Sequence, residues 1–430
     1  MFRKIIFTGL LLLSVLTGYV QQQKETVFRS NIQTAMLFPY GNQMGMAMIR
    51  LNSGDQLELH FDDMDGDYKN YYYTYQLCNA DWTPALISYF DYIKGYTNVR
   101  INTFRNSSIA KQRYTHYQAY LPEKNCMPSR SGNYLLKVCL DGDTSKTVFT
   151  KRVLVVEEKV TAGVQVIQPF SGMLNRTHQR MVLRINANSL NVTNPHQQIK
   201  VVALQNNRWD NAITNLPPTF VRGKELEYNN DNDLIFESGR EWRWLDLRSF
   251  RFWSDRVASS ENLADGTHIY VKPDISRGGM RYAFYRDLNG MYTIENTDNI
   301  NPYWQSDYAT VHFYYAPEGG RPFPDRDVYL MGKLSDYGQH PRSKMVYNAE
   351  KGVYETSVKL KQGYYNYEYA TVNRRTGEQR PMINETEGNF WETENTYQVL
   401  VYYRSFGART DELVSFMSVS SYNGRLNPGF

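Results

Sequence analysis

The 430-residue sequence lacks the features by which several common protein classes are recognised. Its formal net charge is only +4 and no long run of lysine and arginine occurs, which argues against nucleic acid binding driven by counterion release. After residue 20, no apolar segment reaches the roughly 20 residues that a membrane-spanning helix needs. Strong helical periodicity is missing as well, so little helix is expected.

Cysteine is scarce, with only Cys78, Cys126 and Cys139. An exported chain could pair two of them, and Cys126 and Cys139 are close enough in sequence to clip a loop. The simpler interpretation, which we prefer, is three isolated small residues of a packed core.

The sequence also lacks motifs for catalysis or cofactor binding. The seven histidines are scattered, with neither H-x-H nor H-E-x-x-H spacing, so a zinc site has little support. No G-x-S-x-G elbow, P-loop or dinucleotide-binding glycine motif occurs. The 44 carboxylates could form a glycosidase pair in space, but no particular pair stands out. We therefore predict a protein that is not an enzyme and that holds neither metal nor cofactor.

The N-terminus has the layout of a secretory signal peptide. A short basic head at residues 1–4 precedes an apolar stretch at residues 5–16, and polar residues 21–24 follow. A membrane anchor would need a longer apolar run, and no cysteine follows closely enough for a lipoprotein anchor. We predict that residues 1–20 are a signal peptide and that the mature chain is exported without a transmembrane segment.

Tyrosine is abundant, and apolar residues alternate with polar ones. The chain has 35 tyrosines, a residue that favours strands. Residues 57–61 alternate with period two, and Tyr71, Tyr73 and Tyr75 line one face of the next run. We predict an all-β fold of three tandem antiparallel β-sandwich domains, immunoglobulin-like or early-set in type. The expected boundaries are residues 21–157, 158–300 and 301–430.

The stretch FDDMDGD at residues 61–67 raises the question of a calcium site. An EF-hand loop places glycine at its sixth position. Gly66 falls at position five, four or two when the count starts from Asp62, Asp63 or Asp65, so no register fits. Aspartate and glycine also form turns. We prefer a turn between strands, with a calcium loop of another type as the alternative.

Two aromatic clusters are candidate binding sites. Exposed Trp242, Arg243 and Trp244 would be typical of a protein interface, whereas the same alternation in a buried strand supplies core side chains. Exposed Tyr364 and Tyr367 could stack on sugars, or they are simply neighbours in a sheet. We prefer the core interpretation for both clusters, with these five residues as the candidate binding residues.

Residues 327–369 resemble the early-set sandwich modules that bind starch and glycogen. The similar pieces are residues 328–332, GVYE at 352–355 and GYYNYEY at 363–369. Asp336 and Tyr337 stand where those modules often have a tryptophan. This resemblance implies a carbohydrate-binding envelope protein as an alternative function.

A longer resemblance covers nearly the whole mature chain. The sequence is similar to the plug-protein family of the type IX secretion system of Bacteroidota. The matching stretches include residues 61–67, CNADW at 78–82, 131–138, LQNNRWDNAI at 204–213 and 361–367.

The plug-protein resemblance implies a non-enzymatic periplasmic protein associated with the outer membrane. Such proteins close the periplasmic end of the translocon barrel, while another subunit occupies its side opening. The implied partner is that barrel. The shared motifs are expected to define the fold, so no catalytic or contact residue is carried over.

Overall fold

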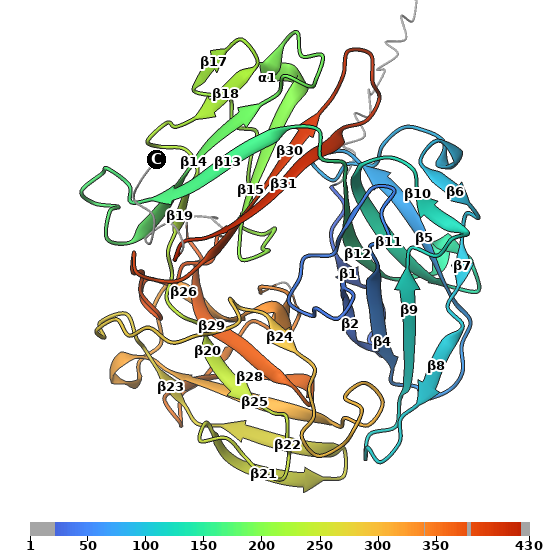
Figure 1. Ribbon diagram of the computed structural model, residues 1–430. Helices are drawn as coiled ribbons and strands as arrows, with labels where there is room; N and C mark the ends of the chain where they lie inside the picture. Colours follow the sequence, from blue (N-terminus) through green and yellow to red (C-terminus); the bar gives the residue numbers. More distant parts are fainter. Residues whose placement is uncertain (1–21, 339, 376–379, 423–430) are drawn as a thin grey trace, which may run out of the picture.

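The computed structural model describes residues 22–338, 340–375 and 380–422, and the expected signal peptide at residues 1–20 lies outside them. Within these ranges the chain forms seven β-sheets. Six of the sheets pack in pairs around three large apolar cores, giving three sandwich-like bodies (Figure 1). The predicted all-β class is confirmed, and the immunoglobulin-like or early-set type stays a prediction.

Body 1 is built from the N-terminal part of the described chain. Its first sheet has the order β1-β12-β11-β5-β7, with β3 beside β12, and its second has the order β2-β4-β9-β8; β6 and β10 form a small separate pair. The strands are β1 (Thr26–Val27), β2 (Ile32–Pro39), β3 (Met48–Arg50), β4 (Leu57–Asp63), β5 (Tyr71–Cys78), β6 (Ile93–Gly95), β7 (Val99–Arg100), β8 (Thr103–Asn106), β9 (Thr115–Leu121), β10 (Cys126–Pro128), β11 (Gly132–Leu140) and β12 (Thr147–Val156), with 3-10 turns η1 (Tyr89–Asp91) and η2 (Thr144–Lys146).

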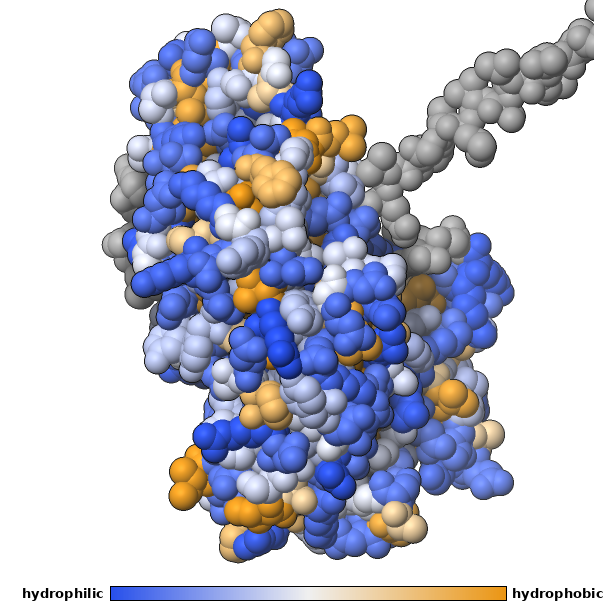
Figure 2. All heavy atoms as spheres, turned by 90° about the vertical axis from the view of Figure 1, so that its right-hand side faces the viewer, coloured by the Kyte–Doolittle hydropathy of each residue, from blue (hydrophilic) through white to orange (hydrophobic). Residues whose placement is uncertain are grey.

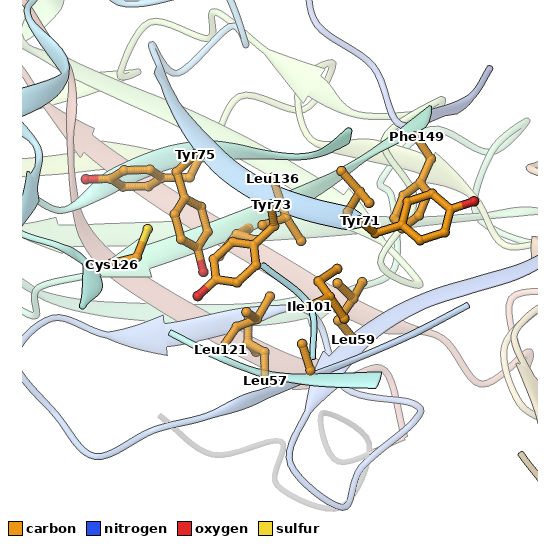
Figure 3. Packing of buried hydrophobic residues seen from close by; sticks show 14 of the residues in the cluster. Leu57, Leu59, Tyr71, Tyr73, Tyr75, Ile101, Leu121, Cys126, Leu136 and Phe149 are labelled. Carbon is orange, nitrogen blue, oxygen red and sulfur yellow. The ribbon is translucent and has the colours of Figure 1, made fainter. Parts of the chain in front are cut away.

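The period-two alternation in the sequence predicts which tyrosines form part of the core of body 1. Tyr71, Tyr73 and Tyr75 of β5 point together into the space between the two sheets, where they meet Leu57 and Leu59 of β4 (Figure 3). Because strand side chains alternate between faces, a run with a tyrosine at every second position buries all of them on one side. The predicted tyrosine face is therefore confirmed.

Body 2 combines two distant parts of the chain. The sheet β13-β14-β18-β17, with β19 beside β14, faces the sheet β16-β15-β30-β31. The elements are β13 (Thr161–Ile167), β14 (His178–Asn186), α1 (Pro195–Gln198), β15 (Ile199–Gln205), β16 (Ile213–Thr214), β17 (Phe220–Arg222), β18 (Glu225–Tyr228), β19 (Ile235–Glu237), β30 (Thr396–Tyr403) and β31 (Glu412–Ser420).

Body 3 lies between these two parts of body 2 in the sequence. The sheet β20-β29-β24, with β26 beside β29, faces the sheet β21-β22-β25-β28-β27, with β23 beside β25. The elements are β20 (Arg243–Asp246), β21 (Val257–Leu263), β22 (Gly266–Val271), β23 (Asp274–Ile275), β24 (Tyr292–Thr293), β25 (Tyr308–Ala316), η3 (Glu318–Gly320), β26 (Arg326–Met331), η4 (Lys333–Ser335), β27 (Val346–Asn348), β28 (Val353–Lys361) and β29 (Tyr364–Asn373).

Bodies 2 and 3 do not coincide with the predicted consecutive domains at residues 158–300 and 301–430. β15 pairs along its whole length with β30, from Ile199–Tyr403 to Gln205–Tyr397, so the last strands complete body 2 rather than body 3. β20 to β24, which precede residue 301, belong to body 3. The period-two pattern identifies a strand but does not name its partner, because pairing is decided by contacts far apart in sequence.

Two further sequence predictions can be compared with the structure. Cys78, Cys126 and Cys139 are all buried and free, which confirms the interpretation as isolated core residues. In the described part of the chain, no helix has the length and apolar character to cross a membrane.

Candidate functional site

The polar and aromatic groups that stand out lie where the three bodies meet. Two of the regions that make these contacts carry most of these groups. One is the loop at residues 206–212, which follows β15 and is called the junction loop below. The other is the interface between β4 and β9 of body 1 and β25 and β28 of body 3.

The junction loop begins with a sharp change in backbone direction. Asn206 and Asn207 have φ angles of 57° and 59°, in the left-handed region that asparagine tolerates better than most residues. The Asn206 side chain and the Asn395 side chain hydrogen bond at 2.8 Å, and the amide N–H of Asn207 donates to Gln398 at 3.0 Å. These contacts with the chain beside β30 hold the loop in place.

On one side, the junction loop packs against body 1. The ring of Trp209 meets the ring of Trp82 edge to face, with centroids 5.0 Å apart. The guanidinium of Arg152 lies 4.4 Å from the Trp82 ring and 4.8 Å from the Trp209 ring. Edge-to-face packing of two aromatic rings is favourable, and so is a cation close to an aromatic ring. These contacts attach body 1 to the junction loop.

On the other side, the same loop packs against body 3. The Arg208 guanidinium lies 4.8 Å from the Tyr337 ring and pairs with Asp210 of its own loop at 2.7 Å. It also reaches to 4.0 Å from the buried Glu368. Burial raises the pKa of Glu368 to about 8, and the Arg208 charge offsets only part of this effect. Adjacent residues of one loop therefore hold two different bodies.

The second contact is a buried ion pair between body 1 and body 3. Asp62 of β4 accepts hydrogen bonds from Lys361 at the end of β28 and from the Tyr308 hydroxyl at 2.5 Å. The Asp62 and Lys361 side chains are each only 1% exposed. Burial alone would raise the pKa of Asp62, but the Lys361 ammonium and a hydrogen bond with His116 hold it below its usual range. The Asp62 carboxylate is therefore charged at neutral pH, while burial lowers the pKa of Lys361 and the Asp62 charge offsets part of this effect.

A row of side chains continues from Asp62 across β9 and β4. His116 Nδ1 lies 2.7 Å from Asp62, His116 Nε2 lies 3.1 Å from His60 Nδ1, and His60 Nε2 lies 2.9 Å from Glu58. The ring of Tyr303 stacks on His60 at 4.0 Å. Burial lowers the pKa of His116 to about 4 and also lowers that of His60, so both rings are neutral at neutral pH.

Sequence spacing did not reveal this grouping of histidines. His60 and His116 are 56 residues apart and meet only because β4 and β9 are neighbours. A second pair, His268 and His312, forms in the same way across β22 and β25, with ring nitrogens 2.9 Å apart. The only local signal was the alternation that places residues 58, 60 and 62 on one face of β4.

Three of the five candidate binding residues are buried. Arg243 pairs with Asp274 at 2.8 Å and Glu387 at 3.0 Å, and the Tyr367 hydroxyl donates to Asp274 at 2.8 Å. Trp242 is also buried and lies apart from this cluster, 5.7 Å from the Arg208 guanidinium. Because the Tyr367 ring is fully enclosed, it has no face on which a sugar could stack.

The other two candidates lie on one side of β20 and β29 and contact each other. Trp244 and Tyr364 are half-buried, and their rings are stacked with centroids 6.2 Å apart. Arg256 and Arg248 flank the pair, with guanidinium carbons 5.8 Å from Trp244 and 5.6 Å from Tyr364. The two ring systems are thus neighbours in a sheet that keep part of their surface exposed.

The acidic stretch gathers three carboxylates around a lysine. Asp63, Asp65 and Asp67 bring ligand atoms within 4.8 Å of one another. The Lys69 ammonium lies 2.7 Å from Asp63 and 3.1 Å from Asp67, and it also pairs with Asp65. Gly66, with a φ of 71°, turns the chain between them. The stretch is a turn after β4 in which the Lys69 ammonium offsets part of the negative charge of the three carboxylates.

The comparison with known families identifies the first body of the chain. Residues 32–157 match the family described as "Type 9 secretion system plug protein 1st domain". Residues 32–157 are therefore a first domain of the type 9 secretion system plug protein family. No curated protein matches the chain.

A solved structure extends the likeness beyond the first body of this plug-family chain. The crystal structure of a hypothetical protein from Parabacteroides merdae is similar with a TM-score of 0.87 and 31% sequence identity, covering 93% of this chain and 100% of the other. The family match contains Asp62 and Trp82, whereas their partners Lys361 and Trp209 lie outside it. The contacts that join the bodies therefore connect the family-defining body to the rest of the chain.

Proposed function

We propose that this plug-family protein is a non-enzymatic periplasmic subunit of the type IX secretion system. It docks on the outer-membrane translocon barrel and closes the periplasmic end of the channel. Family membership implies a structural component of this secretion system in the cell envelope and association with its translocon. The docking itself is the further step that we propose.

The observation that carries the proposal is the way the three bodies are joined. A plug must be wide and must not deform when it is pressed against a pore. One body of about 130 residues has a width of roughly 35 Å, and three bodies joined by the junction loop and the Asp62–Lys361 pair are wider still. Because both contacts are buried or closely packed, they resist bending between the bodies.

The surface supports reversible docking. Figure 2 shows one face on which hydrophilic residues predominate and apolar residues form small, separate patches. A partner that must be released when cargo arrives is better served by a modest, polar interface than by a large apolar one. The surface of this face therefore suits a plug that leaves the channel.

Affinity purification of the tagged protein from detergent-solubilised envelopes, followed by mass spectrometry, tests the docking. We expect a very large outer-membrane barrel to be recovered at native expression. A Trp209→Ala, Arg208→Ala variant loosens the junction loop and should recover less barrel, while Arg222→Ala, which changes an exposed residue of body 2, should recover as much as the unchanged protein. A clean monomer at native expression would overturn the proposal.

Envelope permeability provides a second test. Deletion of the gene should make the outer membrane leakier to large molecules, because the channel loses its closure. Re-expression of the unchanged protein should restore the barrier. Unchanged permeability in the deletion strain would contradict the closing role even if the barrel is recovered in the purification.

A further inference from the structure

A groove runs between body 1 and body 3. It consists of two adjoining cavities of 1020 Å³ and 760 Å³ that share lining residues, among them Glu25, Ala35, Tyr292 and Lys333. Together these cavities are called the inter-body groove below. Its walls come from β2, the segment before it, the loop around Met46 and β12 on one side, and from β24, β26, β28, β29 and the region around η4 on the other, with the junction loop at the larger cavity.

One wall of the inter-body groove is an edge strand. β2 is the end strand of its sheet and pairs only with β4. Residues 32–35 line one cavity and residues 35–38 line the other, so the groove follows almost the whole strand. The outer edge of such a strand presents N–H and C=O groups that can pair with another extended chain. The strand is irregular between Gln33 and Met36, where Thr34 has a φ of 49°, and its regular residues 36–39 extend over roughly 13 Å.

The larger cavity is lined by adaptable apolar side chains. Met46 and Met291 line it with part of their surface exposed, together with the half-buried ring of Tyr292, whereas Met36 and Met331 lie behind them in buried core positions. Methionine has an unbranched, polarizable side chain that adjusts to different partners and is common at binding surfaces that accept varied sequences. This lining suits the alternate side chains of an added strand.

The inter-body groove is strongly basic. Ten lysine and arginine side chains line it against four aspartate and glutamate side chains, an excess of six in a chain whose total formal charge is +4. Some of these cations are neutralised by neighbours, such as Lys361 by Asp62. Four others are exposed and form no ion pair with any carboxylate in the described ranges, namely Lys24, Arg29, Arg342 and Arg380. The groove therefore attracts negative charge.

We propose that the inter-body groove binds an extended polypeptide segment with acidic side chains, which adds a strand to the free edge of β2. The main-chain pairing provides affinity, the methionine-lined cavity accepts alternate apolar side chains, and the four exposed cations select for acidic ones. This binding activity goes beyond closure of the channel and does not depend on it.

Fluorescence anisotropy with a defined peptide tests the proposal on the full chain. The probe is a labelled 12-residue peptide that alternates valine and glutamate. We expect it to bind at least about tenfold more tightly than the same peptide with lysine in place of glutamate. A version with N-methyl groups on alternate amides keeps the charge but cannot pair as a strand, and it should also bind at least about tenfold more weakly. Equal binding of the N-methylated peptide would overturn the strand addition.

Two matched variants distinguish binding in the inter-body groove from attraction by the overall charge of the protein. The groove variant carries Lys24→Gln, Arg29→Gln, Arg342→Gln and Arg380→Gln, and the control carries Lys94→Gln, Arg222→Gln, Lys272→Gln and Arg409→Gln. All eight side chains are exposed, so both proteins should fold, and both lose four positive charges. We expect the groove variant to weaken binding of the acidic peptide about tenfold or more and the control to change it less than about twofold. Equal loss in both variants, or none in the groove variant, would overturn the proposal.

Discussion

Asp62 and Asp63 are neighbours on β4, yet they belong to two different ionic clusters. Asp62 pairs with Lys361, which is 299 residues away in sequence, and neither side chain is exposed beyond 1%. Asp63 pairs with Lys69, only six residues away, in a turn whose other carboxylates, Asp65 and Asp67, are largely exposed. Successive strand residues point to opposite faces, so one aspartate faces body 3 and the other faces the local turn.

The comparison shows that the same residue type has a different role according to what surrounds it. In the local cluster, Asp65 and Asp67 are exposed and can exchange their partner for water, whereas Asp63 is buried and is also held by hydrogen bonds from Asn31 and Tyr71. The buried pair has no such alternative, because removing one partner leaves an uncompensated charge inside the protein. We therefore expect perturbations of the two clusters to differ in size.

The largest difference is expected from Lys361→Met. Loss of the ammonium leaves Asp62 buried without its cation, and we expect the free energy of unfolding to fall by about 3–5 kcal/mol. Urea denaturation followed by tryptophan fluorescence measures the change. Lys359→Met, two residues earlier on the same strand, removes a half-buried lysine with no ion pair in the described ranges and should cost no more than about 1 kcal/mol. Equal losses in the two variants would contradict a special role of the buried pair.

The next effect is a fall in stability between pH 6.5 and pH 5, which comes from the buried histidine beside Asp62. His116 has a pKa of about 4 in the folded protein because of burial, and about 6.5 when unfolded. Below pH 6.5, His116 binds a proton in the unfolded chain but stays neutral in the folded protein. The free energy of unfolding therefore falls as the pH falls. Between pH 6.5 and pH 5 the loss from this group is about 1.6 kcal/mol.

The matched variants for this pH dependence are His116→Gln and His196→Gln. The first should flatten the fall in stability between pH 6.5 and pH 5, measured by urea denaturation at each pH. The second changes an exposed histidine and should leave the fall unchanged. If His116→Gln keeps the full slope, His116 is not the group responsible.

A smaller effect is expected from Lys69→Met in the local cluster. Asp65 and Asp67 are exposed and regain hydration when the ammonium is removed, and Asp63 keeps hydrogen bonds from Asn31 and Tyr71. We expect a loss of about 1 kcal/mol in urea denaturation. A loss as large as that of Lys361→Met would remove the distinction between the two clusters.

The smallest effect is expected when calcium or a chelator is added and the Tm is measured. The Lys69 ammonium already lies among the three carboxylates, so millimolar calcium or a chelator should shift the Tm of the unchanged protein by less than about 1 °C. In Lys69→Met the carboxylates lack a cation, and calcium should raise the Tm measurably. A rise of several degrees in the unchanged protein would show that the turn holds calcium after all.

Local features of the fold were predictable, whereas partnerships between distant segments were not. The alternation around Tyr71 and Tyr73 predicted both a strand and its buried face, and the glycine position excluded an EF-hand loop around Asp62. The pairing of β15 with β30 was not predictable, because a C-terminal strand completes body 2 after the whole of body 3 has intervened. The histidine pairs were missed for the same reason.

By itself, the sequence determined the all-β class, the inward tyrosine face of β5 and the turn in the stretch at residues 61–67, since side-chain alternation and turn formation depend on neighbouring residues. Only the tertiary structure decided that Asp62 meets Lys361, that Arg208 and Trp209 contact different bodies, and that the free edge of β2 faces a basic groove. These features depend on which sheets pack together, and packing is set by the combined burial of residues from across the chain.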